Sequence, residues 1–146
     1  MASMSRTLAA WVAGLKYEDL PADVVDRAKG LTLHGLSSAL IGHGFPESGQ
    51  ALRMMQEEEA GGGGAATVLV EGAKLTKAGA ALVNAEMIFA GGKWDTYRML
   101  THPGCAIIPA ALVASETGGA SGRDYITGLV AGYEVMERLA ADFILS

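Results

Sequence analysis

The stretch "SGRDYITGLVAGYEVM", residues 121–136, indicates the fold class of this chain. It begins with Ser121 and Asp124, the capping-box pattern in which two side chains satisfy backbone amides at a helix start. Apolar side chains then recur at the i, i+3, i+4 and i+7 spacing that places them on one helix face: Ile126, Leu129, Val130, Tyr133 and Met136. The stretch therefore predicts a long amphipathic helix near the end of the chain.

The same reasoning applied upstream predicts more helices. Proline suits a first helical turn and glycine a helix end, and such signals bound most of the apolar stripes. The expected helices cover residues 5–15, 22–42, 46–59, 78–90 and 103–116, with Ser5 as the first cap and fraying expected at the three glutamates 57–59. Glycines 61–64 read as a flexible break. The run "ATVLVEGAKLT", residues 66–76, predicts a small hairpin turning at Glu71 and Gly72.

These elements predict a mainly α fold, a single helical domain over residues 1–146 with one short β-hairpin. Half of the residues are hydrophobic, and the mean hydropathy is +0.27. This apolar excess indicates a surface that contacts a partner, either a second copy or another chain. We expect the contact to use the helices over residues 78–90 and 125–139.

Charge and cysteine content exclude several classes of protein. The net charge is −5 and the pI is about 5.1, without the basic face that nucleic-acid binders carry. The single cysteine, Cys105, cannot form an intramolecular disulfide and fits a reducing compartment, so we expect a cytoplasmic protein. Residues 1–15 lack a signal-peptide pattern, and no apolar run reaches ~18–20 residues, so no membrane helix is expected.

One segment, "AGGKWDTYRMLTHPG" at residues 90–104, gathers polar and aromatic side chains within an otherwise apolar chain. His102 lies just before a predicted helix start, where free N–H groups favour a bound carboxylate. Lys93 and Arg98 can add charge-assisted contacts to such an acid. Asp95 and His102 form a candidate acid/base pair. The alternative, an ordered surface loop held by caps and ion pairs, stays open on these residues alone.

Other chemically active residues carry weaker signals. "GGK" at residues 91–93 resembles the end of a phosphate-binding loop, but Trp94 stands where that motif needs Ser or Thr. His34 is expected to be packed and hydrogen-bonded in a helix, and His43 to fill a turn. Cys105 follows a helix start that can lower a thiol pKa, yet a small buried residue is the better reading. Glu86 points either at the polar segment or at solvent. No Cys/His spacing predicts a metal site.

Three phrases in order resemble the MmgE/PrpD family, which includes 2-methylcitrate dehydratase, cis-aconitate decarboxylase and iminodisuccinate epimerase. Residues 8–42, with "LPADVVDRAK", are similar to the family's opening helices. Residues 65–85 are similar to its hairpin and following helix. Residues 101–135, from "THPG" to "GYEV", are similar to its His-Pro segment and the next two helices. The order and spacing of the phrases make the resemblance more specific than any one of them.

The family's most characteristic motif, roughly H-x-x-D-[FY]-D-D-T-H before T-H-P, falls on the polar segment. Asp95 and Thr96 match its last Asp and its Thr, and residues 101–103 match T-H-P. Four positions depart from it: Phe89 stands for the first His, Gly92 for the first Asp, Trp94 for the middle Asp and Tyr97 for the closing His. The Asp usually given a catalytic part in the family is therefore absent.

The resemblance implies a lyase or isomerase that transfers a proton on a small carboxylic acid without metal or organic cofactor. It implies catalytic roles for Asp95 and His102, Asp95 acting as a base or holding the loop. The substrate would be bound by Lys93, Thr96, Tyr97 and Arg98. Family members are much longer and add a lid domain that this sequence lacks.

Three explanations of the short length are open: a truncated chain, a naturally small protein, or one subunit of a split enzyme. The expected partner is a second copy or a chain supplying the rest of the fold. Two rival functions also remain. One is a degenerate homologue that scaffolds or regulates a full-length partner. The other is a pocket repurposed for specialised metabolism, in which Trp94 and Tyr97 stack on a larger substrate.

Overall fold

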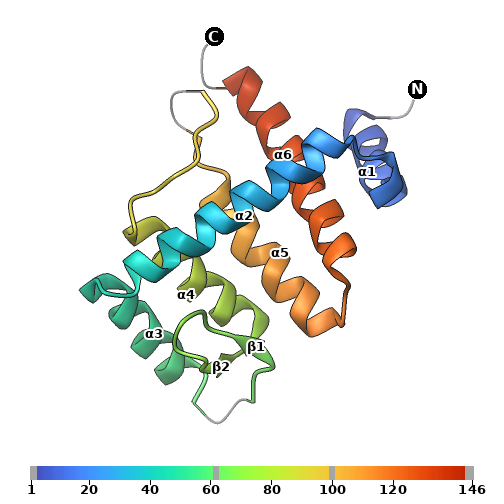
Figure 1. Ribbon diagram of the computed structural model, residues 1–146. Coiled ribbons are helices and arrows are strands. Elements are labelled where there is room, and N and C mark those ends of the chain that lie inside the picture. The colour runs from blue at the N-terminus through green and yellow to red at the C-terminus, as the bar shows by residue number, and fades with distance from the viewer. Residues whose placement is uncertain (1–2, 61–62, 99–100, 144–146) are drawn as a thin grey trace.

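A computed structural model describes residues 3–60, 63–98 and 101–143, in which the chain forms helices and one small hairpin (Figure 1). The elements in chain order are α1 (Met4–Gly14), the 3-10 turn η1 (Tyr17–Asp19), α2 (Ala22–Gly42), α3 (Pro46–Glu58), β1 (Ala66–Thr67), β2 (Lys74–Leu75), α4 (Lys77–Ala90), α5 (Gly104–Gly118) and α6 (Gly122–Phe143). The predicted fold class, mainly α with one hairpin, is confirmed.

Helix α4 lies at the centre of the packing, because it contacts α2, α3 and α5. Its inward residues are small or apolar and almost fully buried: Ala80, Val83, Met87 and Ile88. Small residues let neighbouring helices approach closely. A Cβ at Gly42 in α2 would lie 1.8 Å from the Met87 carbonyl oxygen. The carboxyl ends of α2 and α4 therefore meet backbone to backbone.

The hairpin is held to α4 by one buried amide. The two strands pair antiparallel, with Thr67 opposite Lys74. The Asn84 side chain of α4 accepts a hydrogen bond from the Leu69 amide at 2.7 Å and donates one to the Thr67 carbonyl at 3.0 Å. Since Asn84 is 1% exposed, both of its polar atoms find partners where water cannot reach them. The predicted hairpin is confirmed, with shorter strands than its sequence run.

Two helix ends differ from expectation. The cap of α1 is Ser3, whose side chain accepts from the Arg6 amide at 3.3 Å, so Ser5 lies inside the helix. Fraying was expected at the end of α3, but Glu59 accepts hydrogen bonds from the amide and the hydroxyl of Thr76, at 2.7 and 2.5 Å. This pairing ties the end of α3 to the start of α4. Gly61 and Gly62 of the predicted glycine break lie outside the described residues.

Helix α6 begins as its sequence predicts. The Ser121 hydroxyl and the Asp124 carboxylate exchange hydrogen bonds with each other's backbone amides, at 3.3 and 2.9 Å. The Ser121 hydroxyl also donates to the Asp124 carboxylate at 2.7 Å, and this bond, followed by the one from the Ser121 amide, lowers the pKa of Asp124. The helix then packs against α5 and α2, with Leu129 fully buried.

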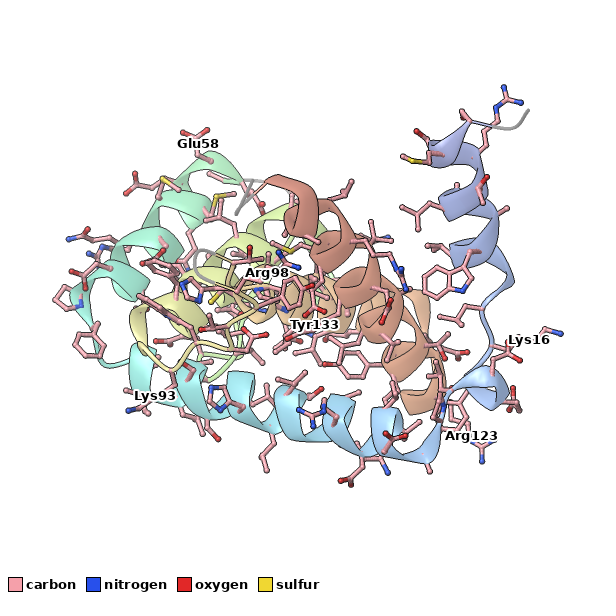
Figure 2. The ribbon with its side chains drawn as sticks, turned by 90° about the horizontal axis from the view of Figure 1, so that it is seen from above. Lys16, Glu58, Lys93, Arg98, Arg123 and Tyr133 are labelled. Carbon is pink, nitrogen blue, oxygen red and sulfur yellow. The ribbon has the colours of Figure 1, made fainter. Side chains whose placement is uncertain are left out.

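Helix α1 stands away from this packing (Figures 1 and 2). None of its residues is buried. The η1 turn after it is anchored to α6, because the Arg123 guanidinium lies 5.0 Å from the Tyr17 ring centroid and 3.6 Å from the Glu18 carboxylate. No helix in the described part of the chain has the length and apolarity needed to cross a membrane.

A paired alanine substitution tests the close crossing of α2 and α4. We expect Gly42→Ala to lower the free energy of unfolding by about 3 kcal/mol, because its Cβ meets a backbone oxygen that cannot move aside. Gly30→Ala in the same helix has nothing within 4 Å of the added Cβ, and should raise it by about 0.5–1 kcal/mol through helix propensity. Urea denaturation measures both changes. Equal effects of the two substitutions would refute the crossing.

Candidate active site

The carboxylate of Asp95 joins three elements at the end of the polar segment. Its oxygens accept the Gly104 amide, the first of α5, at 2.9 and 3.0 Å. One of them also accepts the Tyr133 hydroxyl of α6 at 2.6 Å. A carboxylate at a helix N-terminus is favoured by the unpaired amides and by the helix dipole. Asp95 therefore fixes the loop to the start of α5 and to the middle of α6.

Glycine at position 104 is required for this contact. A Cβ there would lie 2.7 Å from both the Asp95 Oδ1 atom and the Tyr133 hydroxyl oxygen. The sequence predicted that the α5 start would offer its free amides to a substrate carboxylate. For the Gly104 amide this is wrong, because the chain's own Asp95 takes that hydrogen bond. The helix start does bind a carboxylate, but that carboxylate is the side chain of Asp95.

The acidic character of this corner shifts two pKa values on α6. Burial, and then the hydrogen bond and charge of Asp95, raise the pKa of Tyr133 well above its usual range, so its hydroxyl stays a donor. Burial, Glu134 and Asp95 raise the pKa of Glu137, one turn further along the helix. A partly buried carboxyl with a raised pKa close to a candidate site is a common feature of functional sites.

His102 is oriented by the loop backbone. Its Nδ1 atom lies 3.0 Å from the Asp95 carbonyl oxygen and 3.3 Å from the Thr96 hydroxyl. Since a carbonyl only accepts, Nδ1 carries the proton and Nε2 is left with its lone pair in the neutral ring. No described residue bonds to Nε2. His102 thus meets the backbone of Asp95 and not its carboxylate, so the two residues do not form a side-chain acid/base pair.

An aromatic stack covers one side of the imidazole. The Trp94 ring centroid lies 4.9 Å from that of His102, with the two rings tilted by 50°, and Phe89 stacks on Trp94 at 4.8 Å with an interplanar angle of 18°. The indole N–H donates to the Phe89 carbonyl at 2.8 Å, which satisfies an end carbonyl of α4. Trp94 keeps 40% of its surface exposed, so the stack forms one edge of the site.

Helix α2 holds the first part of the loop. Its buried Ser38 hydroxyl donates to the Ile88 carbonyl at 2.8 Å and accepts the Lys93 amide at 3.3 Å. The His34 Nε2–H donates to the Lys93 carbonyl at 3.0 Å. His34 was expected to be hydrogen-bonded, which is confirmed, and packed, which is wrong because its side chain is exposed. His43 likewise has a partner, the Glu71 carboxylate at 2.7 Å.

The two cations of the segment lie apart from each other (Figure 2). Lys93 is exposed on the α2 side of the loop. Arg98 donates from Nη1 to the Ala141 carbonyl of α6 at 3.3 Å and covers the Tyr97 ring at 5.7 Å from its centroid. A cation near a helix C-terminus is favourable, so Arg98 anchors the loop to the end of α6.

The segment closes on itself through one bridge. The Tyr97 amide donates to the Thr101 carbonyl at 2.9 Å. Thr101 is 5% exposed, and its hydroxyl has no hydrogen-bond partner among the described residues. An unpaired buried hydroxyl is costly, so this position has unused capacity to bind a polar group.

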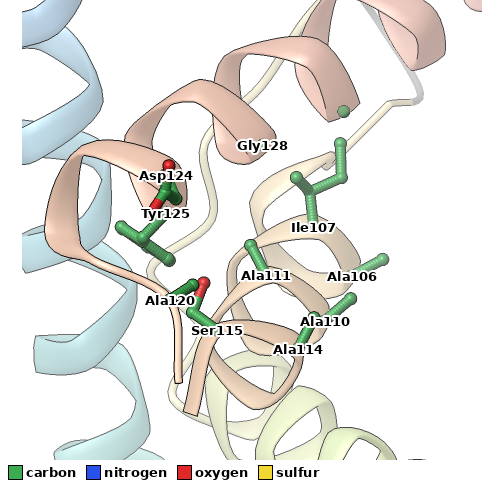
Figure 3. A pocket seen from close by; sticks show the side chains of 11 residues that line it. Ala106, Ile107, Ala110, Ala111, Ala114, Ser115, Ala120, Asp124, Tyr125 and Gly128 are labelled. Atoms are coloured by element: carbon green, nitrogen blue, oxygen red, sulfur yellow. The ribbon is translucent and has the colours of Figure 1, made fainter. Parts of the chain in front are cut away.

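Three surface cavities border this region. A cleft of about 570 Å³ between α2 and the loop is lined by Arg27, His34 and Asp95, together with the acids of the α2 first turns. A groove of about 880 Å³ between α3 and α4 includes Glu86 and Cys105, so Glu86 faces this groove. The third, about 580 Å³ between α5 and α6, is lined mostly by alanine and glycine (Figure 3). The first cavity has the charged groups that a polar ligand needs.

Two chemical properties remain to be described: the reactivity of the Cys105 thiol and the capacity of the described residues to bind a metal ion. Burial, and then the charge of Asp95, raise the pKa of the Cys105 thiol to about 11. The α5 start therefore does not activate this thiol, because burial and then the nearby charge of Asp95 disfavour the thiolate. Within the described residues, no group of three or more His, Cys, Asp or Glu side chains is arranged to hold a metal ion.

Sequence reasoning missed three residues that this geometry brings to the site. Tyr133 was counted as part of an apolar stripe, Glu137 was not singled out, and Arg27 was read only as part of a helix. Gly104 in the "HPG" run is the signal that could have indicated this contact, because a glycine at a helix start permits a close side-chain approach.

Known proteins resemble this chain over almost its whole length. Residues 6–145 match the family model of the MmgE/PrpD N-terminal domain. A cis-aconitate decarboxylase-like protein of Aspergillus oryzae is 30% identical over 148 residues, covering 95% of this chain and 30% of that protein. A cis-aconitate decarboxylase of Aspergillus terreus is 29% identical over 136 residues, covering 88% of this chain and 27% of that protein. The chain spans about three tenths of the length of these curated relatives. No solved structure matches it.

Removing one hydroxyl tests the Asp95 contact. Tyr133→Phe takes the 2.6 Å donor from a carboxylate, and we expect the free energy of unfolding to fall by about 1.5–3 kcal/mol. Tyr125→Phe is the matched control on the same helix. It removes a neutral bond to Thr32 at 2.9 Å and should cost about 1 kcal/mol. Denaturant titration of both variants decides, and a larger loss for Tyr125→Phe would contradict the ranking.

Proposed function

Because the chain belongs to the MmgE/PrpD family, whose N-terminal domain it matches over residues 6–145, we propose that it forms part of a lyase or isomerase site. The reaction transfers a proton on a small carboxylic acid. The relatives named as cis-aconitate decarboxylases favour a di- or tricarboxylate as the substrate class. The proposed chemistry needs no metal or organic cofactor.

The orientation of His102 is the observation that carries this proposal. With Nδ1 committed to the Asp95 carbonyl, Nε2 is the atom that takes a proton from the substrate or returns it. When Nε2 is protonated, the ring also carries the charge that binds a carboxylate.

The acid groups of the substrate would meet the exposed polar residues around His102. Thr96 lies 3.3 Å from the imidazole and offers its hydroxyl to a carboxylate. Lys93 supplies charge from the α2 side of the loop. We assign Tyr97 and Arg98 to the same binding surface, where the contact of Arg98 with α6 sets their position. The substrate thus lies along the loop between its α2 and α6 anchors.

Asp95 has two proposed roles, and its contacts favour one. Both of its carboxylate oxygens receive hydrogen bonds, from Gly104 and from Tyr133. With both oxygens engaged in these hydrogen bonds, the carboxylate holds the loop against α5 and α6. We therefore propose that Asp95 positions His102 through its backbone carbonyl, and that His102 performs the proton transfer.

A second chain would complete the site. The chain spans 30% and 27% of the length of the two relatives. Proton transfer benefits from a site closed to water, and the exposed side chains of Lys93 and Thr96 show one open side. The setting we propose is the cytoplasm, where the lone Cys105 stays reduced.

One rival function has a specific observation in its favour. Gly92 stands where the family carries its first Asp, so a degenerate homologue that scaffolds a full-length partner remains an alternative. Gly92 has a φ of +67°, a left-handed conformation, with nothing within 4 Å of an added Cβ. A side chain there would be moderately strained but would have room.

The other rival function, a pocket repurposed for specialised metabolism in which Trp94 stacks on a larger substrate, has less support. Trp94 already stacks on Phe89 and His102, which occupies much of its ring.

Replacing His102 tests the binding part of the proposal. His102→Ala should weaken the binding of small di- and tricarboxylates, cis-aconitate included, about ten- to a hundredfold, because a charge-assisted hydrogen bond is lost. His43→Ala is the matched control: it breaks an ion pair with Glu71 on the hairpin side and should leave affinity unchanged. Calorimetric titration with thermal melts separates affinity from folding. Unchanged binding in His102→Ala, or its unfolding, would show that the loop is a scaffold.

Restoring the family's Asp separates the enzyme from the scaffold. Hydrogen–deuterium exchange at the carbon beside a substrate carboxylate, followed by proton NMR, detects proton abstraction alone. We expect Gly92→Asp to raise this exchange rate at least about 100-fold, the usual worth of a placed acid or base. Gly92→Asn has the same shape and tolerates the same backbone angle, so it should not. Exchange absent from both the native chain and Gly92→Asp would favour the scaffold function.

A further inference from the structure

Two side chains of α2 bind both backbone groups of one loop residue. Ser38 and His34 lie one turn apart on α2, the spacing that places side chains on the same helix face. The Ser38 hydroxyl accepts the Lys93 amide at 3.3 Å, and the His34 imidazole donates to the Lys93 carbonyl at 3.0 Å. Figure 2 shows Lys93 beside this end of α2. The backbone on both sides of Lys93 is therefore held by one helix.

Ser38 also closes the end of α4. The Gly92 amide bonds to the Phe89 carbonyl at 3.1 Å, three residues back instead of the four of an α-helix. The Ile88 carbonyl instead accepts the Ser38 hydroxyl at 2.8 Å. Ser38 is fully buried, so water cannot replace either of its hydrogen bonds. One hydroxyl thus links the last turn of α4 to the loop that follows it.

Two glycines bring the loop within reach of this hydroxyl. A Cβ at Gly91 would lie 2.0 Å from the Ser38 carbonyl oxygen and 2.5 Å from its hydroxyl oxygen. Gly92 has a φ of +67°, in the left-handed region that favours glycine. The run "GGK" at residues 91–93 therefore serves a close approach of the loop backbone to α2.

The backbone of Lys93 determines where the next side chain begins. The Lys93 carbonyl and the Trp94 amide belong to one planar peptide unit, so the His34 hydrogen bond also holds the start of Trp94. The indole ring then lies 4.9 Å from the His102 ring, centroid to centroid. A continuous series of contacts thus runs from α2 through the loop to the candidate proton-transfer residue.

We propose that Ser38 and His34 are positioning residues of the candidate site. They act through Lys93 and Trp94: the two hydrogen bonds keep the indole ring against the imidazole and keep the lysine side chain on the α2 side of the loop. The effect on ligand binding rests on the proposed function. The effect on the placement of Trp94 does not, since it can be measured without a ligand.

Trp94 fluorescence tests the positioning directly. Trp11→Phe removes the other of the chain's two tryptophans, so all tryptophan emission comes from Trp94. In this background Ser38→Ala should raise the acrylamide quenching constant about twofold, because Trp94 is only 40% exposed while it is stacked. Ser48→Ala is the matched control and should leave quenching unchanged. It removes an equally buried hydroxyl, whose 2.9 Å bond to the Gly42 carbonyl joins α3 to α2.

Replacing His34 gives a second test with little effect on the core, because its side chain is exposed. His34→Leu should raise the quenching constant. His34→Gln should not, because the glutamine amide nitrogen lies the same number of bonds from Cα as Nε2 and can donate to the Lys93 carbonyl. Urea titration shows that Ser38→Ala and Ser48→Ala lose similar stability, so a difference in quenching reports the loop. If Ser38→Ala does not fold, the His34 pair decides.

Calorimetric titration with cis-aconitate measures the consequence for the site. Ser38→Ala and His34→Leu should weaken binding about tenfold, and Ser48→Ala and His34→Gln should not, because a displaced loop misaligns the binding groups. Equal quenching within either pair of variants overturns the proposal, and so does native affinity in Ser38→Ala. Quenching that differs as expected, with no cis-aconitate bound by any of the proteins, supports the positioning role and refutes the proposed function.

Discussion

The hydrogen bonds to the Asp95 carboxylate determine how the candidate site is built. A loop, the first turn of α5 and the middle of α6 meet at this one side chain, which accepts from Gly104 and Tyr133. Each contact depends on the others. Glycine at 104 lets the carboxylate reach the backbone. Burial, reinforced by the Asp95 charge, raises the pKa values of the Tyr133 hydroxyl and the Cys105 thiol. One partly buried carboxylate thus sets the geometry of the corner and contributes to its electrostatics.

The rest of the loop is held by neutral hydrogen bonds to α2. The Ser38 hydroxyl binds the Lys93 amide, and the His34 imidazole binds the Lys93 carbonyl. Ser38 lies within reach because the carboxyl ends of α2 and α4 are in backbone contact. The glycines at that crossing therefore matter to the site as well as to the core. His102 is oriented by the Asp95 carbonyl. The position of this carbonyl follows from the contacts of Lys93 with α2 and of the Asp95 side chain with α5 and α6.

The fold was predictable because its signals are local. Helix stripes, the Ser121 cap and the hairpin turn each depend on residues a few positions apart, and each was confirmed. The site depends on contacts across 38 residues for Tyr133 and 59 for His34, which no spacing encodes. Tyr133 illustrates the difficulty: periodicity correctly places its ring on the packed face of α6, but the same pattern says nothing about where the hydroxyl ends. The sequence predicted that the start of α5 binds a carboxylate of the substrate, whereas its first amide binds the carboxylate of Asp95.

The candidate site is open on one side of the loop. The loop is rigid where it touches α2, α5 and α6, and it exposes Lys93, Thr96 and part of Trp94 on its remaining side. A proton transferred from a carbon acid is easier to control where water is excluded, because electrostatic contacts strengthen as the dielectric constant falls. The exposed apolar side chains around the loop gain from burial for an independent reason. A covering chain would therefore satisfy both demands at the same surface, which links assembly to chemistry in this fold.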